Sequence, residues 1–330
     1  MKTNTLKIMA LIACFALTFS SCSDDDNTVV VEPVDNTITG IASRTNDLSI
    51  LVQALTRADL ATTLQGSGPF TVFAPTNAAF TSFLSANGFA NLDAVPVPIL
   101  REILLNHVVS GAVQSTGLVN NTYIKTLGKG SASNTNTLSM YVNTTSGVRL
   151  NGVSSVTTPN VIASNGVVHI VNAVIGLPTI VTHAAANPNF SILATAVTST
   201  ATNGNGFGDQ TAVATALTTN TTPLTVFAPT NAAFTAATTG SGFAVGATPA
   251  QVTTVLQYHV TGAGNVLAAS LTNGQVIPTV TSPVQNLTVN LTGGAKLIDT
   301  TPTASNIIVT DVQCANGVIH AVDKVLQPNL

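Results

Sequence analysis

Histidine is the side chain whose placement in this sequence most suggests chemistry. His107 and His259 each stand at the end of an apolar run with helical spacing, and His169 and His320 alternate with apolar residues in later runs. A histidine can bind a metal or act as a base when suitable partners lie near it in the fold. No Cys, Asp or Glu stands at ligand spacing from His107 or His259. We therefore interpret the histidines as core groups bonded to the backbone, and we expect no metal site.

Cysteine offers one thiol in the body of the chain. Cys314 lies in a strand-like run and aligns with Ala163 of an earlier, similar run, so we interpret it as a small buried hydrophobe rather than a nucleophile. Of the other two cysteines, Cys14 lies within an apolar N-terminal segment and Cys22 lies just after it. No disulfide within the mature chain is expected.

Carboxylates are too sparse and too scattered for a catalytic pair. Glutamate occurs only at Glu32 and Glu102, and no Gly-x-Ser-x-Gly, phosphate loop or His-Glu-x-x-His is present. A calcium loop is faintly suggested by Asn203, Asn205 and Asp209, but a helix-loop-helix site would need an acidic residue where Ala214 stands. The sequence predicts no catalytic residue and no cofactor.

Charge is sparse along the whole chain. Only 7% of the residues are charged, with a formal net charge of -3. The surface must then consist largely of Thr, Ser, Asn and Gln. Nucleic-acid binding requires clustered Lys and Arg, so we exclude nucleic acid as a partner.

An octapeptide that occurs twice indicates the strands and helices that hold these residues. Phe-Ala-Pro-Thr-Asn-Ala-Ala-Phe stands at 73–80 and again at 227–234, each time after a β-prone run. Thr76 and Thr230 are well placed to cap helices beginning at Asn77 and Asn231. Repetition of this kind predicts two domains of one fold.

Two more stretches repeat in the same order. The helix ending at His107 matches the one ending at His259, and Asn-Gly-Val-Val-His-Ile-Val at 165–171 matches Asn-Gly-Val-Ile-His-Ala-Val at 316–322. Helical spacing comes early in each copy and period-two alternation later, which predicts an α+β fold. We expect one domain at 38–178 and a second at 179–330, with almost no linker.

This constellation resembles the fasciclin domain, twice over, across about residues 38 to 328. The resemblance rests on the octapeptide, the histidine at the helix end and the closing Asn-Gly-Val-x-His strand. It implies that each domain is a β-wedge or sandwich of short strands with helices at one side. In some animal fasciclin domains a Tyr-His pair contacts integrins, so the resemblance makes Tyr258 and His259 candidate binding residues. The first copy has Asn106 before its histidine.

Residues 1–21 are predicted to be a targeting segment. Lys2 and Lys7 precede an apolar run too short to span a membrane, and Ser-Ser-Cys22 resembles a bacterial lipoprotein signal, in the relaxed form of Bacteroidota. We expect Cys22 to carry the lipid. The acidic run at 24–26 resembles an outer-membrane surface export signal, the alternative being a solvated linker within a flexible tether at 22–37.

These features predict a surface-anchored adhesion lipoprotein at the outer membrane, facing the cell exterior. The partner would be extracellular matrix, a cell-surface protein or a polysaccharide, and only the lipid would contact the membrane. One alternative is a glycan-binding accessory protein of a polysaccharide uptake system, for which the chain, without Trp and with three Tyr, has few aromatic platforms. The other is a structural spacer in the envelope.

Overall fold

The structure is a computed structural model that describes residues 34–201, 206–239 and 247–330. The predicted signal segment, Cys22, most of the tether, Asn203 and Asn205 lie outside the described residues. Residues 35–330 form one compact unit that contains both repeats. The mixture of helices and strands confirms the predicted α+β class.

Helices open each repeat. Those of the first repeat are α1 (Ile38–Arg44), α2 (Ser49–Arg57), α3 (Ala61–Gln65), α4 (Asn77–Ala86) and α5 (Val97–Asn106). Those of the second are α6 (Ile180–Ala186), α7 (Ser191–Val197), α8 (Thr211–Thr219), α9 (Asn231–Thr239) and α10 (Pro249–Tyr258). Short 3-10 turns are η1 (Asn46–Leu48), η2 (Leu92–Ala94), η3 (Ser115–Gly117), η4 (Pro188–Phe190) and η5 (Ala268–Ser270).

Strands follow the helices, apart from the one that leads into each octapeptide. In the first repeat they are β1 (Phe70–Pro75), β2 (Val108–Ser110), β3 (Thr122–Lys129), β4 (Thr137–Asn143), β5 (Arg149–Leu150), β6 (Ser154–Ala163) and β7 (Gly166–Val171). In the second they are β8 (Leu224–Pro229), β9 (Val260–Thr261), β10 (Val276–Pro278), β11 (Asn286–Asn290), β12 (Lys296–Ile298), β13 (Ser305–Cys314) and β14 (Gly317–Val322). The first set closes into a barrel, whereas the second forms a sheet in the order β10-β11-β12-β13-β14-β8-β9.

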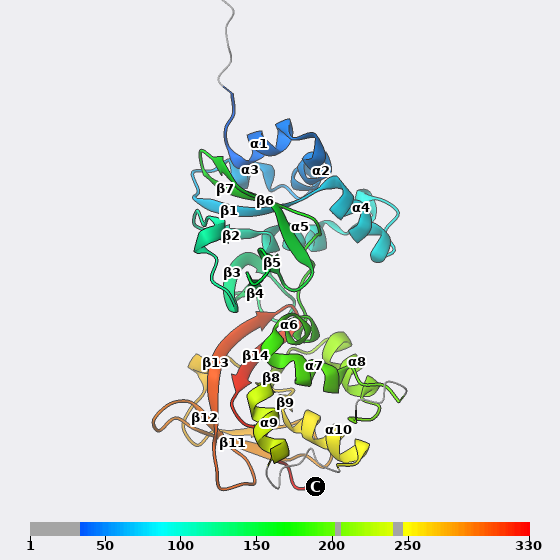
Figure 1. Cartoon of the computed structure of the whole chain (residues 1–330), viewed down its shortest axis with the longest axis vertical. Coiled ribbons are helices and arrows are strands. Elements are labelled where there is room, and N and C mark those ends of the chain that lie inside the picture. The colour runs from blue at the N-terminus through cyan, green and yellow to red at the C-terminus, as the bar shows by residue number, and fades with distance from the viewer. Residues whose placement is uncertain (1–33, 202–205, 240–246) are drawn as a thin grey trace, which may run out of the picture. The chain divides into compact units, whose positions relative to one another are not determined.

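The octapeptide strand and the closing strand of each repeat lie side by side and parallel. Phe73 pairs with His169 in β1 and β7, and Phe227 pairs with His320 in β8 and β14. A side chain at Gly166 would place its Cβ 2.0 Å from the carbonyl oxygen of Phe70, so only glycine permits this approach. The two strands of each pair are far apart in the sequence, and tertiary structure brings them together (Figure 1).

Alternation along β1 divides the core into two layers. Val72 and Ala74 pack among the helices α1 to α5, and Phe73 packs on the other face with Met140 and Val171 inside the barrel. In Figure 1, α1, α2 and α3 lie across β1 from β3 and β4. The second repeat divides in the same way, with Phe227 in the strand layer.

Asparagine side chains connect distant backbone segments in both repeats. The Asn77 Oδ1 atom accepts from the Ile50 amide at 2.9 Å, and Asn231 accepts from Ile192 in the second repeat at 3.0 Å. Thr76 and Thr230 cap α4 and α9 by accepting from the amides of Ala79 and Ala233. The octapeptide therefore fixes both its own helix and the neighbouring one.

Asn165 is buried and bonds three backbone groups from two other segments of the chain. Its Oδ1 atom accepts from the Ile38 amide, and its Nδ2 atom donates to the carbonyls of Leu64 and Gly66. Asn316 takes the same place in the second repeat, accepting from Ile180 and donating to Leu217. The closing hairpin thereby holds the start of its own repeat.

Replacing Asn165 with alanine should lower the free energy of unfolding by about 3 kcal/mol, because buried backbone groups lose their partners. Chemical denaturation of the full chain measures this. Asn91→Ala, which removes only an exposed cap on η2, is the matched control and should cost about 1 kcal/mol or less. Equal losses in the two variants would contradict the role given to Asn165.

Candidate functional site

The helix-end histidines hold the same position in both repeats. His107 Nδ1 lies 2.7 Å from the carbonyl oxygen of Ile103, one turn earlier in α5, and Nε2 accepts from the Ile175 amide at 2.9 Å. His259 makes the matching contacts with Val255 and Leu326. Because Nδ1 faces an acceptor and Nε2 faces a donor, the ring must be neutral with its proton on Nδ1. Each imidazole ties the end of its helix to the segment after the closing strand.

The strand histidines are used in the same manner. His169 Nε2 lies 2.9 Å from the carbonyl oxygen of Val113, and its Nδ1 accepts from the Asn160 amide at 3.2 Å. His320 repeats this arrangement with Val266 and Asp311. These rings also stack on phenylalanine, with centroids 5.4 Å apart for Phe73 and 5.8 Å apart in the second repeat. Both nitrogens are occupied by backbone, so neither ring is available to bind a metal or accept a substrate proton.

Burial sets the protonation of all four rings. It lowers the pKa of His107 and His259 from 6.5 to about 4, partly offset by the bond to a carbonyl oxygen. It lowers the pKa of His169 and His320 as well, again against a carbonyl bond. At neutral pH these histidines are uncharged structural groups.

Tyr258 lies inside the second repeat rather than on its surface. The side chain is 0% exposed, packs with Phe227 and Leu287, and donates its hydroxyl to the Asn286 carbonyl at 2.9 Å. Burial, followed by the negative charge of Asp299, raises the pKa of Tyr258 to about 12. His259 is 3% exposed. A partner at the surface cannot touch either side chain in this conformation, and Asn106 of the first repeat is equally buried.

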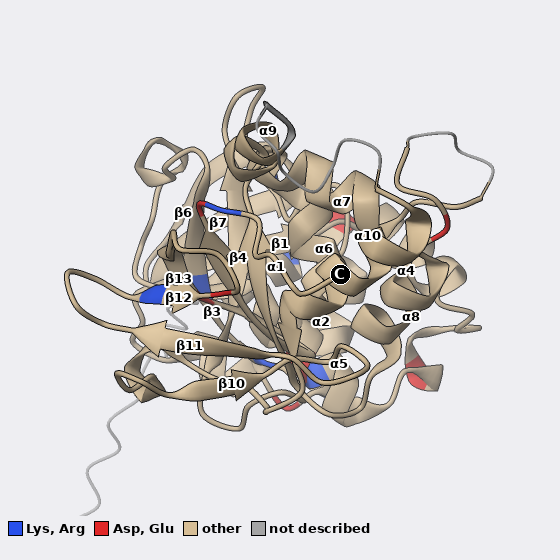
Figure 2. Ribbon diagram, turned by 90° about the horizontal axis from the view of Figure 1, so that it is seen from below, with Lys and Arg blue, Asp and Glu red and all other residues tan. Residues whose placement is uncertain are grey.

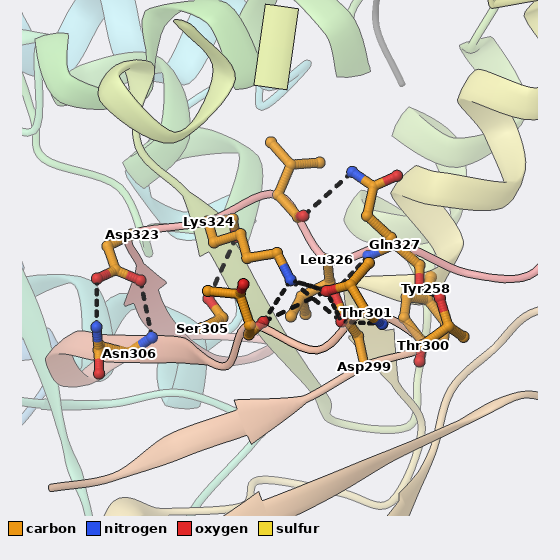
Figure 3. Close-up of polar contacts among 12 residues, drawn as sticks. Tyr258, Asp299, Thr300, Thr301, Ser305, Asn306, Asp323, Lys324, Leu326 and Gln327 are labelled. Carbon is orange, nitrogen blue, oxygen red and sulfur yellow. Dashed lines mark hydrogen bonds and ion pairs between the residues drawn. The ribbon is translucent and has the colours of Figure 1, made fainter. Parts of the chain in front are cut away.

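Next to Tyr258, a clasp secures the end of the second repeat (Figure 3). The Asp299 carboxylate lies 3.0 Å from the Lys324 ammonium and accepts from the amides of Thr301 and Gln327. Burial raises the pKa of Asp299, but these hydrogen bonds outweigh it and hold the pKa below its ordinary value. The clasp orders the segment that presents the Leu326 amide to His259. The Asp299 carboxylate and the Lys324 ammonium are both bonded to groups of the same repeat, which favours a structural role.

Other sequence candidates carry no chemistry in the described residues. Cys314 is fully buried, and burial raises the pKa of its thiol, so it stays protonated. Asp209 accepts from the amide and hydroxyl of Thr211 at the start of α8. Within the described ranges, no three His, Cys, Asp or Glu side chains lie close enough to hold a metal ion. The same ranges contain no helix of the length and hydropathy needed to cross a bilayer.

The repeats contact one another through β4 and β13. Ser139 Oγ accepts from the Gln313 amide at 2.9 Å, and the Ala132 amide donates to the carbonyl of Ala315 at 2.9 Å. Met140 and Val142 of β4 face the barrel interior, while Ser139 and Tyr141 are also almost fully buried. Both faces of β4 are therefore covered, one by the barrel interior and the other in part by the second repeat.

Two polar residues at this junction, Lys125 and His183, were not predicted from the sequence, because neither belongs to a repeated motif. Lys125 donates to Ser139 Oγ at 3.0 Å and to the Asp311 carbonyl at 2.9 Å, and burial lowers its pKa. His183 of α6 is fully buried edge-on against Tyr123, and neither ring nitrogen has a hydrogen-bond partner of good geometry in the described structure. Burial lowers the pKa of His183 to about 3, although the nearby Ser139 backbone offsets part of this effect.

Comparison with known proteins identifies the repeated unit. The family model described as Fasciclin domain matches residues 46–178 and 188–328. Two Synechocystis sp. proteins are similar: sll1735 is 33% identical over 138 residues, covering 42% of this chain and 96% of its own, and sll1483 is 32% identical over 139 residues, covering 42% and 72%. A solved FAS1 domain pair from the insect cell adhesion molecule fasciclin I has a TM-score of 0.48 and 18% identity, covering 85% of this chain and 97% of its own.

Acidification should destabilise the protein through its buried histidines. Each has a folded pKa below 6.5, so the unfolded chain binds more protons and the free energy of unfolding falls as pH drops from about 6.5 toward 4. His183→Phe removes one such group together with its unpaired nitrogens. This variant should differ from wild type by about 1 kcal/mol or less at pH 8 and be the more stable of the two at pH 5.

Urea denaturation at a series of pH values measures both effects. His107→Phe is the matched control, because it also removes a titrating ring but breaks two backbone bonds, and it should destabilise the protein at every pH tested. If His183→Phe and wild type lose stability in parallel on acidification, His183 is not one of the groups responsible.

Proposed function

Because this chain belongs to the fasciclin family, we propose that it is an extracellular adhesion module held at the outer membrane by a lipid on Cys22. Fasciclin domains are associated with adhesion or binding rather than with catalysis. In this proposal the two repeats face the cell exterior and attach to matrix, a surface protein or a polysaccharide. The lipid is the only part that enters the membrane.

The proposal is supported by the structural role of the polar residues that both repeats share. The histidines and asparagines common to both copies form hydrogen bonds with the backbone, as at His107 and His259 or Asn165 and Asn316. Such residues build a scaffold, and their own polar atoms are occupied within it. A rigid scaffold whose outer surface differs between the two repeats suits binding.

The scarcity of charge indicates how the surface would bind. Lys, Arg, Asp and Glu are scattered over a ribbon of mostly uncharged residues (Figure 2), and the described residues contain ion pairs only at Arg57–Asp93 and Lys324–Asp299. Contacts would therefore be hydrogen bonds and small apolar contacts from Thr, Asn and Val side chains. Many copies on one cell would multiply weak individual contacts.

The N-terminal sequence supports the anchor. A lipid on Cys22 with further acylation would hold the protein stably in the bilayer, whereas a single chain would not. The tether that follows could reach at most about 50 Å when fully extended. That length would lift the first repeat clear of the lipid headgroups.

Cys22→Ala should release the protein from the membrane fraction or leave it as an uncleaved precursor, because no acyl chain can be attached. Fractionation with a salt wash, followed by immunoblotting, measures this outcome. Cys314→Ala is the matched control, since that thiol is buried in the second repeat, and it should not change membrane retention. Retention of the Cys22→Ala protein at high salt would contradict lipid anchoring.

Cell attachment should change little with ionic strength, because few charges are available to be screened. The measurement compares cells carrying the full chain with cells that display only the anchor and tether, from about 0.05 to 0.5 M salt. Attachment that survives removal of both repeats would contradict the adhesion proposal. A steep loss with added salt would instead contradict the neutral-surface mechanism.

A further inference from the structure

A cavity of about 400 Å³ lies where the two repeats meet. Its walls come from β3 and β4 of the first repeat and from η4, β13, β14 and Thr230 of the second. This volume falls within the range of about 300–1,000 Å³ that is typical of small-molecule sites. The Gln313 backbone amide of β13 donates to the Ser139 hydroxyl of β4 and so links the two walls, and the cavity lies within the compact unit.

One wall is apolar, and the first repeat has no counterpart to it. Ile308 is 52% exposed and Val309 is 41% exposed, and both line the cavity. Asn160 and Asp311 mark equivalent positions, since each has a positive φ and donates its amide to the strand histidine. Three and two residues before them, Thr157 and Thr158 of the first repeat are therefore equivalent to Ile308 and Val309 of the second. The second repeat thus exposes hydrocarbon at a position where the first has hydroxyl groups.

The remaining lining supplies hydrogen-bonding groups. Asn121 Oδ1 accepts from the Tyr141 hydroxyl, while its Nδ2 has no partner among the described residues. The Asn189 side chain is exposed and likewise has no bond within the described structure. The Lys125 ammonium uses two acceptors and has one N–H remaining. These free donors and the Tyr123 side chain line the same cavity as Ile308 and Val309.

The combination of groups selects the class of ligand. A pyranose ring presents C–H faces that pack on apolar side chains and hydroxyl edges that bond to amides and ammonium groups. Burial lowers the pKa of Lys125, and the nearby negative charge of Asp311 offsets part of this effect, so the cavity has charges of both signs and does not favour a free anion. Building on the proposed role in adhesion, we infer that this cavity binds one pyranose residue of a glycan.

Binding of simple sugars to the purified full chain tests the inference. The probes are the methyl glycosides of glucose, galactose, mannose and N-acetylglucosamine, together with glucuronate and inorganic phosphate, followed by saturation-transfer NMR and calorimetry. We expect at least one sugar to bind with a Kd of about 1 mM and phosphate not to bind. Phosphate binding with displacement of the sugar would make this an anion site and overturn the inference.

Variants locate the binding. The double change Ile308→Thr and Val309→Thr, which installs the residues of the first repeat, should weaken the sugar affinity about tenfold by removing the apolar wall. Asn189→Ala should weaken it as well. Ile162→Thr is the matched control, because Ile162 is a 61% exposed residue of β6 outside the cavity, and it should leave the affinity unchanged.

The outcomes separate this inference from the adhesion proposal. The double variant should keep the wild-type unfolding midpoint, because the replaced side chains are exposed. If no sugar in the panel binds, or if the double variant binds as well as wild type, the sugar site is refuted. Attachment of cells carrying the repeats would then still support adhesion through another surface.

Discussion

The hydrogen bonds of the helix-end histidines are the interaction on which each repeat depends. Three pieces of chain meet there: the end of α5 or α10, the octapeptide strand, and the segment after the closing strand. His107 bonds the first and third through its ring, and its carbonyl accepts from the Phe73 amide at 2.9 Å. His259 does the same with Phe227. A neutral imidazole can do this because it offers one donor and one acceptor on opposite sides of a rigid ring.

The constraint explains why the residues most suggestive of chemistry are the least available for it. An imidazole that must accept from a backbone amide cannot also hold a proton or a metal on the same nitrogen. Burial makes the charged form costly, which is why the pKa of His107 and His259 falls to about 4. Repetition of a histidine in two copies is therefore a sign of shared architecture in this chain. Functional differences have to be sought where the copies differ.

The copies differ in their strand layers and at their junction. The first repeat closes a barrel and the second a more open sheet. Tyr258 fills the strand layer of the second repeat, whereas Asn106 bonds the carbonyls of Ile175 and Gly176 in the first. At the junction, Lys125 of the first repeat contacts the second, and His183 of the second repeat lies against the first. Neither residue belongs to a repeated motif. Binding specificity is more easily built from such unmatched residues than from the shared scaffold.

The sequence by itself determined the repeat, the α+β class and the local elements. The octapeptide specifies a strand, a cap at Thr76 and a helix from Asn77 within a few residues, and such short-range signals depend only on residues that are neighbours in the sequence. Tertiary structure decided the partners of the polar side chains. Asn165 reaches Ile38, and His107 reaches Ile175, across long stretches of chain that no local pattern connects. It also decided that Tyr258 is buried, that β4 is covered on both faces and that a cavity lies beside β13, because these depend on how separate segments pack together.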